Sequence, residues 1–432
     1  MERIESSPGR RPRVIFLGYG FDTAHGGGGE HAMTEFATRL ADLGYPTQVI
    51  ILSAGERVRR ESFSNLSVEV LSAPFLNFLR RRPFPTRLSK WAMQILTAWN
   101  PVTTWRLKRV LQRSAADVLV TNSIRYMSPS VWGVAKTSGM RVVHLMHSYA
   151  LLCRLNTMRR EDMNCTDLCW SCRQMMRVKR RNARHVDRAL GVSYHVTTTH
   201  AENGFFDESQ SGTISNIVKK SYCRLAGSFE LPLTFGFLGQ IGPTKGLHIL
   251  LEAYSRLSHS GVGPLLVAGS ANPQYKAALQ ERHRDTRIEW RGYVDPAAFL
   301  LEIDILVVPS VWQEPQGRVA LEALRHGVPV IASAVGGLRD MAAYTEGVRL
   351  IPSGDVVALY QAMAELIARP SRVREMSRAA PDIDALCSPQ AVMDGLANAV
   401  DGPAQAEAAR TAPSASAAWA AASRSKHGGT SP

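Results

Sequence analysis

The sequence lacks any long hydrophobic run. In its 432 residues, no apolar stretch reaches the roughly 18 residues that a membrane-spanning helix needs. The N-terminal segment Met1–Glu5 is charged and has no apolar core of the kind found in a secretory signal. We therefore expect a cytoplasmic protein rather than an integral membrane protein or a secreted one.

Cysteine is scarce, and its distribution is uneven. Of the six cysteines, four lie within 20 residues of one another: Cys153, Cys165, Cys169 and Cys172. In a cytoplasmic chain, such a cluster favours a metal site or reduced thiols over a set of disulfides. Four thiolates can complete a tetrahedral zinc site, so these residues are candidate ligands of a structural zinc ion. The alternative is that reduced thiols only pack a loop.

Acidic residues are few in the first half of the chain. Residues 1–230 hold 33 Lys and Arg against 18 Asp and Glu, whereas residues 231–432 hold 18 against 19. The first half should therefore meet an anionic partner, which could be nucleic acid, an anionic membrane surface or an anionic substrate. Because the sequence has no recognised nucleic-acid-binding module, we do not expect nucleic acid to be that partner.

Two basic segments favour the membrane surface. Residues 78–113 combine tryptophans with many cations, which include the arginines and the lysine of residues 80–90. Residues 173–188 form a second basic block. Basic segments that carry tryptophan are typical of contacts with anionic lipid, so we expect a peripheral position at the inner face of the membrane. The alternative is a solvated helix face.

Short apolar runs alternate with helical patterns, and this alternation starts twice. The predicted strands are residues 14–18, 47–52, 67–71, 117–121, 141–146 and 189–193, and then 233–239, 264–269, 288–292, 305–310, 329–333 and 348–352. Alternation of this kind implies parallel sheets. We therefore predict an α/β protein with two Rossmann-like, doubly wound domains, residues 1–215 and 216–400. Residues 401–432 are rich in Ala, Ser and Gly and are predicted to be disordered.

Two segments could hold a phosphate group at the start of a helix. Gly26–Gly29 precede a helix that begins near Glu30, and consecutive glycines let backbone N–H groups approach an anion. In the second half, a strand ends at Gly239 and a short loop carries Lys245 to the next helix. A lysine at a helix N-terminus is disfavoured by the helix dipole unless an anion lies between them. A flexible glycine loop and a solvated lysine are the alternatives.

The most informative segment is residues 309–332. A strand ends at Ser310, a loop holds Glu314, and the following helix carries Glu322. A carboxylate can accept hydrogen bonds from two hydroxyl groups at once, which suits a sugar or a ribose. The free backbone N–H groups of residues 316–319 suit a phosphate. The alternative is a surface helix with two solvated glutamates.

These motifs together resemble the family 4 glycosyltransferases of the GT-B fold. The resemblance rests on the Glu-x7-Glu pair, the Lys-Gly after a Gly-ended strand, the N-terminal glycine loop and the later pair Gly336–Gly337, and it covers about residues 12–400. It implies two domains that face each other across a cleft. The first would be the acceptor domain, with the cysteines in an insertion at residues 150–175. The second would be the nucleotide-sugar donor domain, whose last helix is a candidate to pack back on the first.

The resemblance also implies a reaction. It predicts a retaining enzyme that moves a hexose from a UDP- or GDP-linked sugar to a glycan or a lipid-linked acceptor, in cell-surface polysaccharide biosynthesis. No cofactor or divalent metal would be required for catalysis. The alternatives are a sugar-nucleotide epimerase of the same fold and a non-catalytic sugar-nucleotide-binding protein.

Residue roles follow from the same resemblance. Glu314 would touch the donor sugar, Lys245 would neutralise the diphosphate, and His147 would contact the reacting sugar. Glu322 would hold the ribose hydroxyl groups. The full set of donor-binding candidates is Gly27, Gly28, Gln240, Gln316, Gly317, Arg318, Val319, Glu322, Gly336 and Gly337.

Three positions depart from the family pattern. Gln240 stands where the family has an arginine, and an amide cannot neutralise a phosphate. Arg318 is the candidate to compensate for that loss. Asp340 replaces a glutamate, and Gln316 replaces an aromatic residue. These departures leave the choice of donor open.

Overall fold

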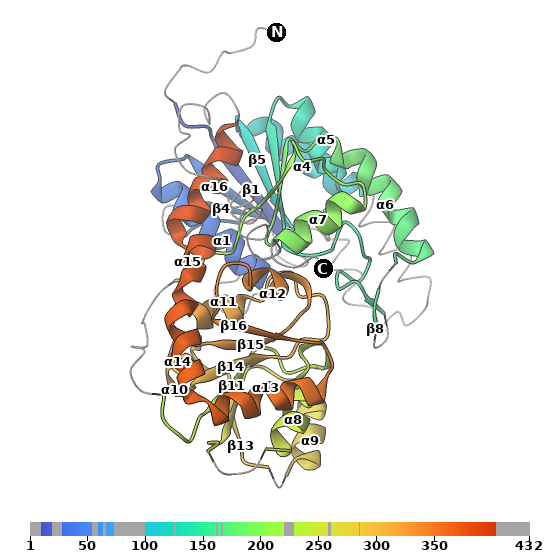
Figure 1. The fold of residues 1–432 in the computed structure, drawn as a ribbon. Coiled ribbons are helices and arrows are strands. Elements are labelled where there is room, and N and C mark those ends of the chain that lie inside the picture. Colours follow the sequence, from blue (N-terminus) through green and yellow to red (C-terminus); the bar gives the residue numbers. More distant parts are fainter. Residues whose placement is uncertain are drawn as a thin grey trace, which may run out of the picture.

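The computed structural model describes residues 10–19, 28–53, 59–63, 66–72, 100–124, 127–160, 163–165, 167–219, 229–257, 261–284 and 286–402. Figure 1 shows two α/β domains, one above the other, with the last helices running along one side from the second domain to the first. Residues 80–90 and 403–432 lie outside the described part, so the predictions for the arginine-rich segment and the disordered tail fall on residues without a structural description.

The first domain is built on an eight-stranded sheet with the strand order β10-β9-β6-β5-β1-β2-β4-β3. Its strands are β1 (Val14–Tyr19), β2 (Thr47–Ser53), β3 (Arg59–Phe63), β4 (Leu66–Ser72), β5 (Val118–Asn122), β6 (Arg141–Met146), β9 (Arg188–Gly191) and β10 (Ser211–Thr213). All neighbours pair in parallel except β3 and β4 at one edge. The central strands are almost wholly apolar because helices cover both faces of the sheet.

Helices on opposite faces make this domain doubly wound. On one face, α1 (Gly28–Asp42) and the chain's last helix, α16 (Pro389–Asp401), share a hydrophobic core. On the other face lie α4 (Pro101–Arg113), α5 (Ser130–Thr137), α6 (Trp170–Ala183) and α7 (Tyr194–Glu202). A hydrogen bond from the Arg141 guanidinium to the Ala399 carbonyl, 2.8 Å, attaches α16 to β6. The last helix therefore lies on the N-terminal domain.

The second domain has a six-stranded sheet with the order β13-β12-β11-β14-β15-β16. Its strands are β11 (Phe235–Leu238), β12 (Leu265–Ala268), β13 (Ile288–Gly292), β14 (Ile305–Val308), β15 (Val330–Ser333) and β16 (Val348–Ile351), and every pair is parallel. One face is covered by α8 (Leu247–Ser255), α9 (Pro273–Arg282), α13 (Val356–Ala368) and α14 (Pro370–Ala379). The other is covered by α10 (Pro296–Glu302), α11 (Arg318–Arg325), α12 (Gly336–Met341) and α15 (Asp384–Cys387).

The predicted strands are all present, each within two residues of its expected bounds. Two further strands of the first sheet, β3 and β10, were not expected from the sequence. Both are short and polar and lie at the edges of the sheet, where no apolar pattern is needed. The two-domain α/β fold predicted from the sequence is confirmed.

The domains meet where β9 leads into α7 and where β14 leads into α11. A small hollow at this junction has walls from both domains: Val192, Ser193, Tyr194 and Thr213 on one side, and Gln316, Gly337, Asp340, Met341, Tyr344 and Leu386 on the other. Side chains from facing strand ends therefore come together at the boundary between the sheets.

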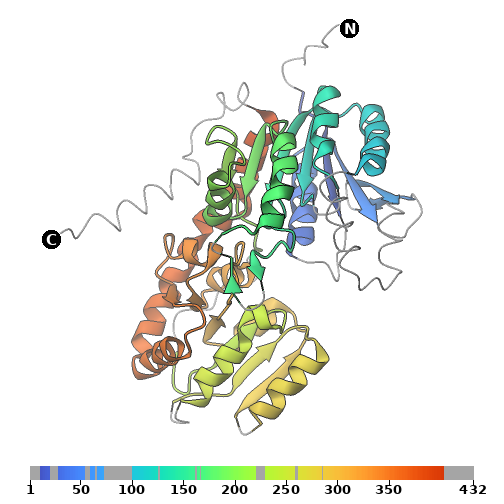
Figure 2. The same ribbon diagram turned by 90° about the vertical axis from the view of Figure 1, so that its right-hand side faces the viewer.

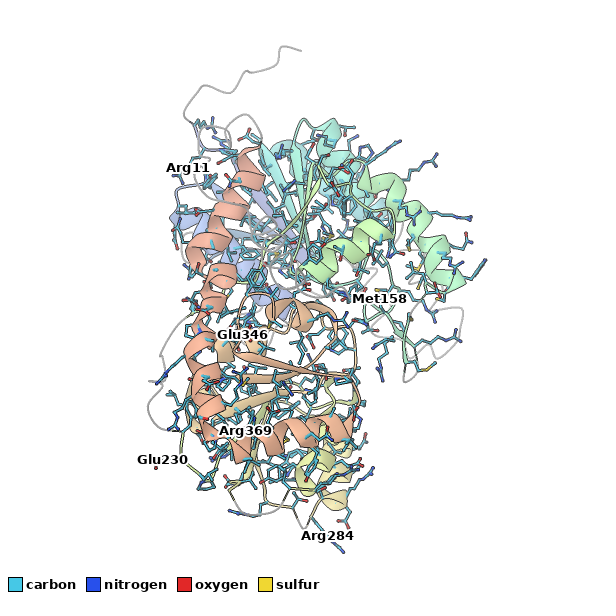
Figure 3. All side chains as sticks on the ribbon, viewed as in Figure 1. Arg11, Met158, Glu230, Arg284, Glu346 and Arg369 are labelled. Carbon is cyan, nitrogen blue, oxygen red and sulfur yellow. The ribbon has the colours of Figure 1, made fainter. Side chains whose placement is uncertain are left out.

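A small hairpin also reaches this boundary. It is formed by β7 (Arg159–Arg160) and β8 (Met163–Asn164), and it belongs to neither large sheet. Figure 2 shows the hairpin projecting from the first domain toward the second. In Figure 3, Met158, which precedes it, lies on the side of the first domain that faces the second.

Candidate functional site

The carboxylate of Glu314 is the centre of the candidate site. Its Oε2 atom accepts hydrogen bonds from Lys245 Nζ at 2.8 Å, Trp312 Nε1 at 2.9 Å and Ser310 Oγ at 3.2 Å. The side chain of Glu314 is only 10% exposed. An ammonium group beside so enclosed a carboxylate compensates for its lost hydration. Glu314 and Lys245, both predicted as site residues, are thus in direct contact.

The lysine is placed by close backbone packing. Lys245 ends a single 3-10 turn, η1 (Pro243–Lys245), and is followed by Gly246 with a φ of 70°. A Cβ atom on Gly246 would lie 1.9 Å from the Pro309 carbonyl oxygen, so only glycine fits there. The backbone N–H of Val311 donates to the Thr244 carbonyl at 2.9 Å. The loop after β11 is therefore fixed against the loop after β14.

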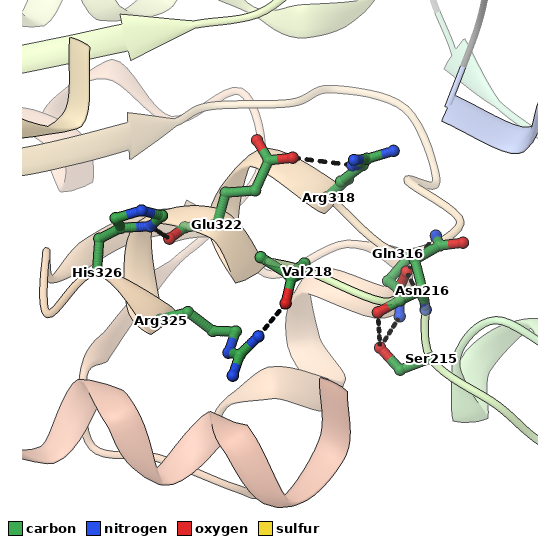
Figure 4. Close-up of polar contacts among 8 residues, drawn as sticks. All are labelled: Ser215, Asn216, Val218, Gln316, Arg318, Glu322, Arg325 and His326. Atoms are coloured by element: carbon green, nitrogen blue, oxygen red, sulfur yellow. Dashed lines mark hydrogen bonds and ion pairs between the residues drawn. The ribbon is translucent and has the colours of Figure 1, made fainter. Parts of the chain in front are cut away.

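The second glutamate lies on α11. Arg318 Nε donates to Glu322 Oε1 at 2.8 Å, and the side chain of Glu322 is 15% exposed (Figure 4). Gly317, with a φ of 86°, caps the helix, whose first-turn N–H groups have no helical acceptor. Val319 is in the same turn and is half-buried. The start of α11, Arg318 and Glu322 thus follow Glu314 closely along the chain.

Gly336 and Gly337 support the Glu314 loop. The backbone N–H of Gly337 donates to the Glu314 carbonyl at 2.8 Å, and that of Gly336 donates to Gln313 Oε1 at 2.9 Å. A Cβ atom on Gly336 would lie 2.1 Å from the Glu314 carbonyl oxygen. The structure thus gives these two predicted donor-binding residues a role in holding the loop.

Gln316 lies at the contact between the domains. Its Nε2 atom donates to the Val192 carbonyl at 2.7 Å. The same atom donates to Ser215 Oγ, also at 2.7 Å (Figure 4). Next to it, Ser193 Oγ donates to the Pro315 carbonyl at 2.6 Å. An aromatic side chain at position 316 could not make these hydrogen bonds. This difference from the family pattern therefore has a structural consequence.

Asp340 also crosses the domain boundary. Its Oδ2 atom accepts from the backbone N–H of His195 at 2.8 Å, in the first turn of α7. Burial raises the pKa of this carboxyl group to about 6. Asp340 was noted from the sequence only as a shortened glutamate. Its contact with the other domain carries no sequence signal, because it depends on how the two domains are placed.

His147 lies in the first domain, directly after β6. Its Nε2 atom is 3.1 Å from Asn216 Oδ1, and its Cβ atom lies 3.4 Å from where a Cβ on Gly29 would be. Burial lowers the pKa of His147 to about 4, so the ring is neutral at pH 7. The histidine is thus placed beneath the start of α1, which follows the glycine loop.

The other predicted donor-binding residues are more dispersed. Gly28 is the first residue of α1, whereas Gly27 lies outside the described residues. Gln240 is exposed after β11. The structure thus brings Glu314 and Lys245 into contact, pairs Arg318 with Glu322, and leaves Gln240 at the surface.

The cysteine insertion contacts the Glu314 loop through its hairpin. Arg159 Nη1 and Asn164 Nδ2 both donate to the Val311 carbonyl at 2.8 Å. Within the insertion, the backbone N–H of Leu155 donates to Cys153 Sγ at 3.4 Å, and Cys169 Sγ lies 3.2 Å from Ser171 Oγ. Among the residues that the structure describes, no three His, Cys, Asp or Glu side chains are grouped so that they could hold a metal ion.

Zinc binding by Cys153, Cys165, Cys169 and Cys172 therefore stays a prediction from the sequence. If the thiolates bind zinc, protein purified without chelator should contain about one equivalent, because structural zinc is bound tightly. Inductively coupled plasma mass spectrometry measures this directly. A content below about a tenth of an equivalent would leave the four residues as reduced thiols.

Fold and site together define a class of protein. Two doubly wound domains meet at the ends of their strands, and one presents an ion pair between Lys245 and the buried Glu314 in the loop that precedes a helix. This is the architecture of a GT-B glycosyltransferase. Two family models match the chain: glycosyl transferase 4-like domain over residues 27–210, and glycosyl transferases group 1 over residues 232–369. The chain belongs to the family 4 glycosyltransferases, as the sequence predicted.

Individual relatives agree with this assignment. An uncharacterized protein of the cps region of Klebsiella pneumoniae is 26% identical, over 73% of this chain and 83% of that protein. The D-inositol 3-phosphate glycosyltransferase of Segniliparus rotundus is 35% identical, over 37% of this chain and only 38% of that enzyme.

Solved structures share the fold. The Anabaena protein HepE in complex with UDP superposes with a TM-score of 0.67 at 16% identity, over 90% of this chain and 99% of that one. Sucrose-phosphate synthase from Thermosynechococcus elongatus gives a TM-score of 0.71 at 20% identity, over 92% of this chain and the whole of the other. The chain therefore shares the fold of these structures.

Proposed function

We propose that this enzyme transfers a hexose from a UDP- or GDP-linked sugar to a glycan or lipid-linked acceptor, with retention of anomeric configuration. The observation that carries the proposal is the enclosed Glu314 carboxylate, held by Lys245 at the ends of β11 and β14. The UDP complex of HepE supports a nucleotide-sugar donor. The relative from the cps region supports a role in cell-surface polysaccharide biosynthesis.

The residues suggest how the reaction proceeds. Glu314 orients the donor sugar, and Glu322 accepts hydrogen bonds from the ribose. Lys245 and the first N–H groups of α11 stabilise the charge that develops on the leaving diphosphate. The bond from the anomeric carbon to the diphosphate oxygen breaks as the acceptor oxygen bonds to that carbon on the same face. The acceptor proton goes to the diphosphate, while Lys245 and the helix N–H groups stabilise the charge that a divalent metal would otherwise stabilise.

The experiment measures products. The protein is incubated with UDP-, GDP- and dTDP-hexoses, with water as the acceptor, and the released hexose is observed by proton NMR before it mutarotates. Release of nucleoside diphosphate with the donor's anomeric configuration supports the proposal, and the opposite anomer excludes retention. Conversion of the nucleotide sugar without release of the diphosphate would indicate the epimerase. Binding without any turnover would indicate the non-catalytic protein.

We also propose that the first domain lies against the inner face of the membrane. In the outer layer of this domain, α4 exposes Trp105 (52% exposed) and α6 exposes Trp170 (68% exposed), and α5 packs against both helices. The same helices carry exposed arginines and lysines. Among the described residues, no helix is long and apolar enough to cross a bilayer.

Removing positive charge from α6 should weaken binding to anionic vesicles. Each cation near such a surface contributes about 1 kcal/mol, so changing Arg177, Arg181 and Arg184 to glutamine should lower the vesicle partition coefficient about a hundredfold. Sedimentation with phosphatidylglycerol-containing vesicles measures this coefficient. The control changes three arginines of α14, Arg372, Arg374 and Arg378, in the other domain. Equal binding by the two triple variants would contradict the proposed surface.

A further inference from the structure

A chain of hydrogen bonds connects the donor domain to the histidine of the other domain. It runs from the Val192 carbonyl through Gln316 and Asn216 to the ring of His147. We infer that Gln316 and Asn216 are positioning residues that fix the tautomer of His147, so that its Nδ1 atom serves as a hydrogen-bond acceptor for a substrate hydroxyl group. This inference rests on the proposed glycosyl transfer, because only then does a sugar hydroxyl lie in the site.

The orientation of the Gln316 amide is set by backbone atoms. One end of the amide lies 2.7 Å from the Val192 carbonyl, which can only accept, so that end must be the NH₂ group. The other end lies 3.2 Å from the backbone nitrogen of Asn216, which can only donate, so that end must be the oxygen. No alternative assignment of oxygen and nitrogen satisfies both contacts.

The orientation of Asn216 then follows. Its side chain also faces the Gln316 oxygen (Figure 4), and an atom that hydrogen-bonds to an oxygen without a hydrogen must be a donor. Nδ2 of Asn216 therefore points to Gln316. Oδ1 is left to face His147 Nε2, at a distance of 3.1 Å.

The tautomer of His147 is the last consequence. Because Oδ1 of Asn216 can only accept, Nε2 of His147 must carry the hydrogen. Burial lowers the pKa of the ring to about 4, so at neutral pH there is no second ring proton. Nδ1 is then an unprotonated acceptor. The other neutral tautomer would place two acceptors 3.1 Å apart, which costs free energy without a compensating hydrogen bond.

The Nδ1 atom has a feature that points to a ligand. It is buried, and it has no hydrogen-bond partner among the described residues. Asn122 Oδ1 is a second buried acceptor without a partner, and the Nδ2 atom of the same side chain donates to the Gly29 carbonyl at 2.8 Å. His147 also lies beneath Gly29. His147 Nδ1 and Asn122 Oδ1 are therefore two acceptors without a hydrogen-bond donor near the start of α1. Hydroxyl groups of a bound sugar could donate to both of them.

The hydrogen-bond chain also couples the tautomer to the domain arrangement. Gln316 belongs to the donor domain, Val192 and His147 belong to the acceptor domain, and Asn216 lies in the segment that joins them. If the domains moved apart, Gln316 would leave Val192 and Asn216. The Asn216 amide could then rotate so that either Oδ1 or Nδ2 faces His147 Nε2, and it would hydrogen-bond to either tautomer of the ring. Closure of the domains thus selects the form of His147 that accepts a hydroxyl hydrogen.

Two matched variants isolate the Gln316 oxygen. Gln316→Glu keeps an acceptor in front of Asn216, whereas Gln316→Met has a similar length and no acceptor. Both variants lose the amide N–H that donates to Val192, and Gln316→Glu also places a carboxyl oxygen opposite that carbonyl, so the disturbance at Val192 is at least as large in Gln316→Glu as in Gln316→Met. The readout is the pair of ring nitrogen chemical shifts of ¹⁵N-histidine-labelled full-length protein at pH 7, with the His147 signals identified by comparison with His147→Asn.

We expect the wild-type protein and Gln316→Glu to show His147 as the single tautomer with the hydrogen on Nε2. Gln316→Met should show a mixture of tautomers. In donor turnover, its kcat should lie about tenfold below that of Gln316→Glu, with similar KM values for the nucleotide sugar, because one hydrogen bond in the transition state is affected.

Other outcomes overturn the inference. A hydrogen on Nδ1 in the wild-type protein would exclude it outright, and this measurement needs no variant to fold. A single Nε2–H tautomer in Gln316→Met would exclude a role for Gln316. Absence of turnover with every donor would instead contradict the proposed function, because the tautomer is measured without substrate.

Discussion

Replacing Lys245 by alanine should lower kcat for donor turnover by about two to three orders of magnitude, the loss typical when one preorganised group that stabilises transition-state charge is removed. In the protein, the ammonium group is 2.8 Å from the Glu314 carboxylate. Its removal leaves the leaving diphosphate without a cation. Among the described residues, it also leaves the Glu314 carboxylate with the indole of Trp312 and the hydroxyl of Ser310 as its hydrogen-bond donors. Release of nucleoside diphosphate at saturating donor measures the effect.

A matched control exists in the same domain. Lys276 Nζ lies 5.5 Å from the centroid of the Trp290 ring, much as Lys245 Nζ lies 5.4 Å from that of Trp312. Lys276→Ala removes the same charge and a similar cation–π contact, but no carboxylate partner of the candidate site. Its kcat should stay within about twofold of the wild-type value. If Lys245→Ala kept more than about a tenth of the wild-type kcat, Lys245 would not stabilise the leaving group.

Sequence patterns predicted Lys245 and Glu314 as separate site residues, and the contact between them in the structure follows from local order. Each residue follows the end of a strand, and parallel strands place their carboxyl ends at one edge of a sheet. β11 and β14 are neighbours in the sheet, so the two loops meet although the residues are 69 positions apart. Gly246 completes the arrangement, since a side chain there would collide with Pro309.

Contacts between the domains could not be predicted in this way. The sequence predicts Gln316 as a donor-binding residue because it precedes the start of α11, yet its side chain reaches Val192 and Ser215 in the other half of the protein. Asn216 lies in a polar stretch that indicated only a join between domains. Hydrophobic periodicity predicts the helices and strands within a domain. It does not indicate which residue of one domain contacts which residue of the other.

The hairpin of the cysteine insertion shows the same limit. The family resemblance implied an insertion at residues 150–175, but nothing in the sequence indicated that Arg159 and Asn164 would donate to the Val311 carbonyl. Val311 begins the loop that carries Trp312 and Glu314, so the insertion helps to position the site. The acceptor is a backbone carbonyl, which every residue has. The identity of residue 311 therefore could not indicate this contact.

Replacing Glu322 by alanine should weaken binding of the nucleoside diphosphate about tenfold to a hundredfold, because hydrogen bonds to a carboxylate contribute roughly 1.5–3 kcal/mol. Glu322 Oε1 is already 2.8 Å from Arg318 Nε, so the carboxylate is oriented before the nucleotide arrives. Isothermal titration with UDP and GDP gives the dissociation constants. Glu252→Ala is the control, since Glu252 forms a similar ion pair with Arg256 on α8, at 2.9 Å.

A deoxy nucleotide makes this test specific for the ribose. A carboxylate that accepts from both ribose hydroxyl groups loses one hydrogen bond when the 2′-hydroxyl is absent, so the wild-type protein should bind the 2′-deoxy diphosphate about tenfold more weakly than the ribonucleotide. In Glu322→Ala the two nucleotides should bind equally, because the carboxylate that accepts from the ribose hydroxyl groups is absent. If the preference for ribose survived in Glu322→Ala, another residue would hold the ribose, and Glu322 would serve only to orient Arg318. In that case Arg318, freed from its partner, could pair more fully with the diphosphate and replace the cation that is missing at Gln240.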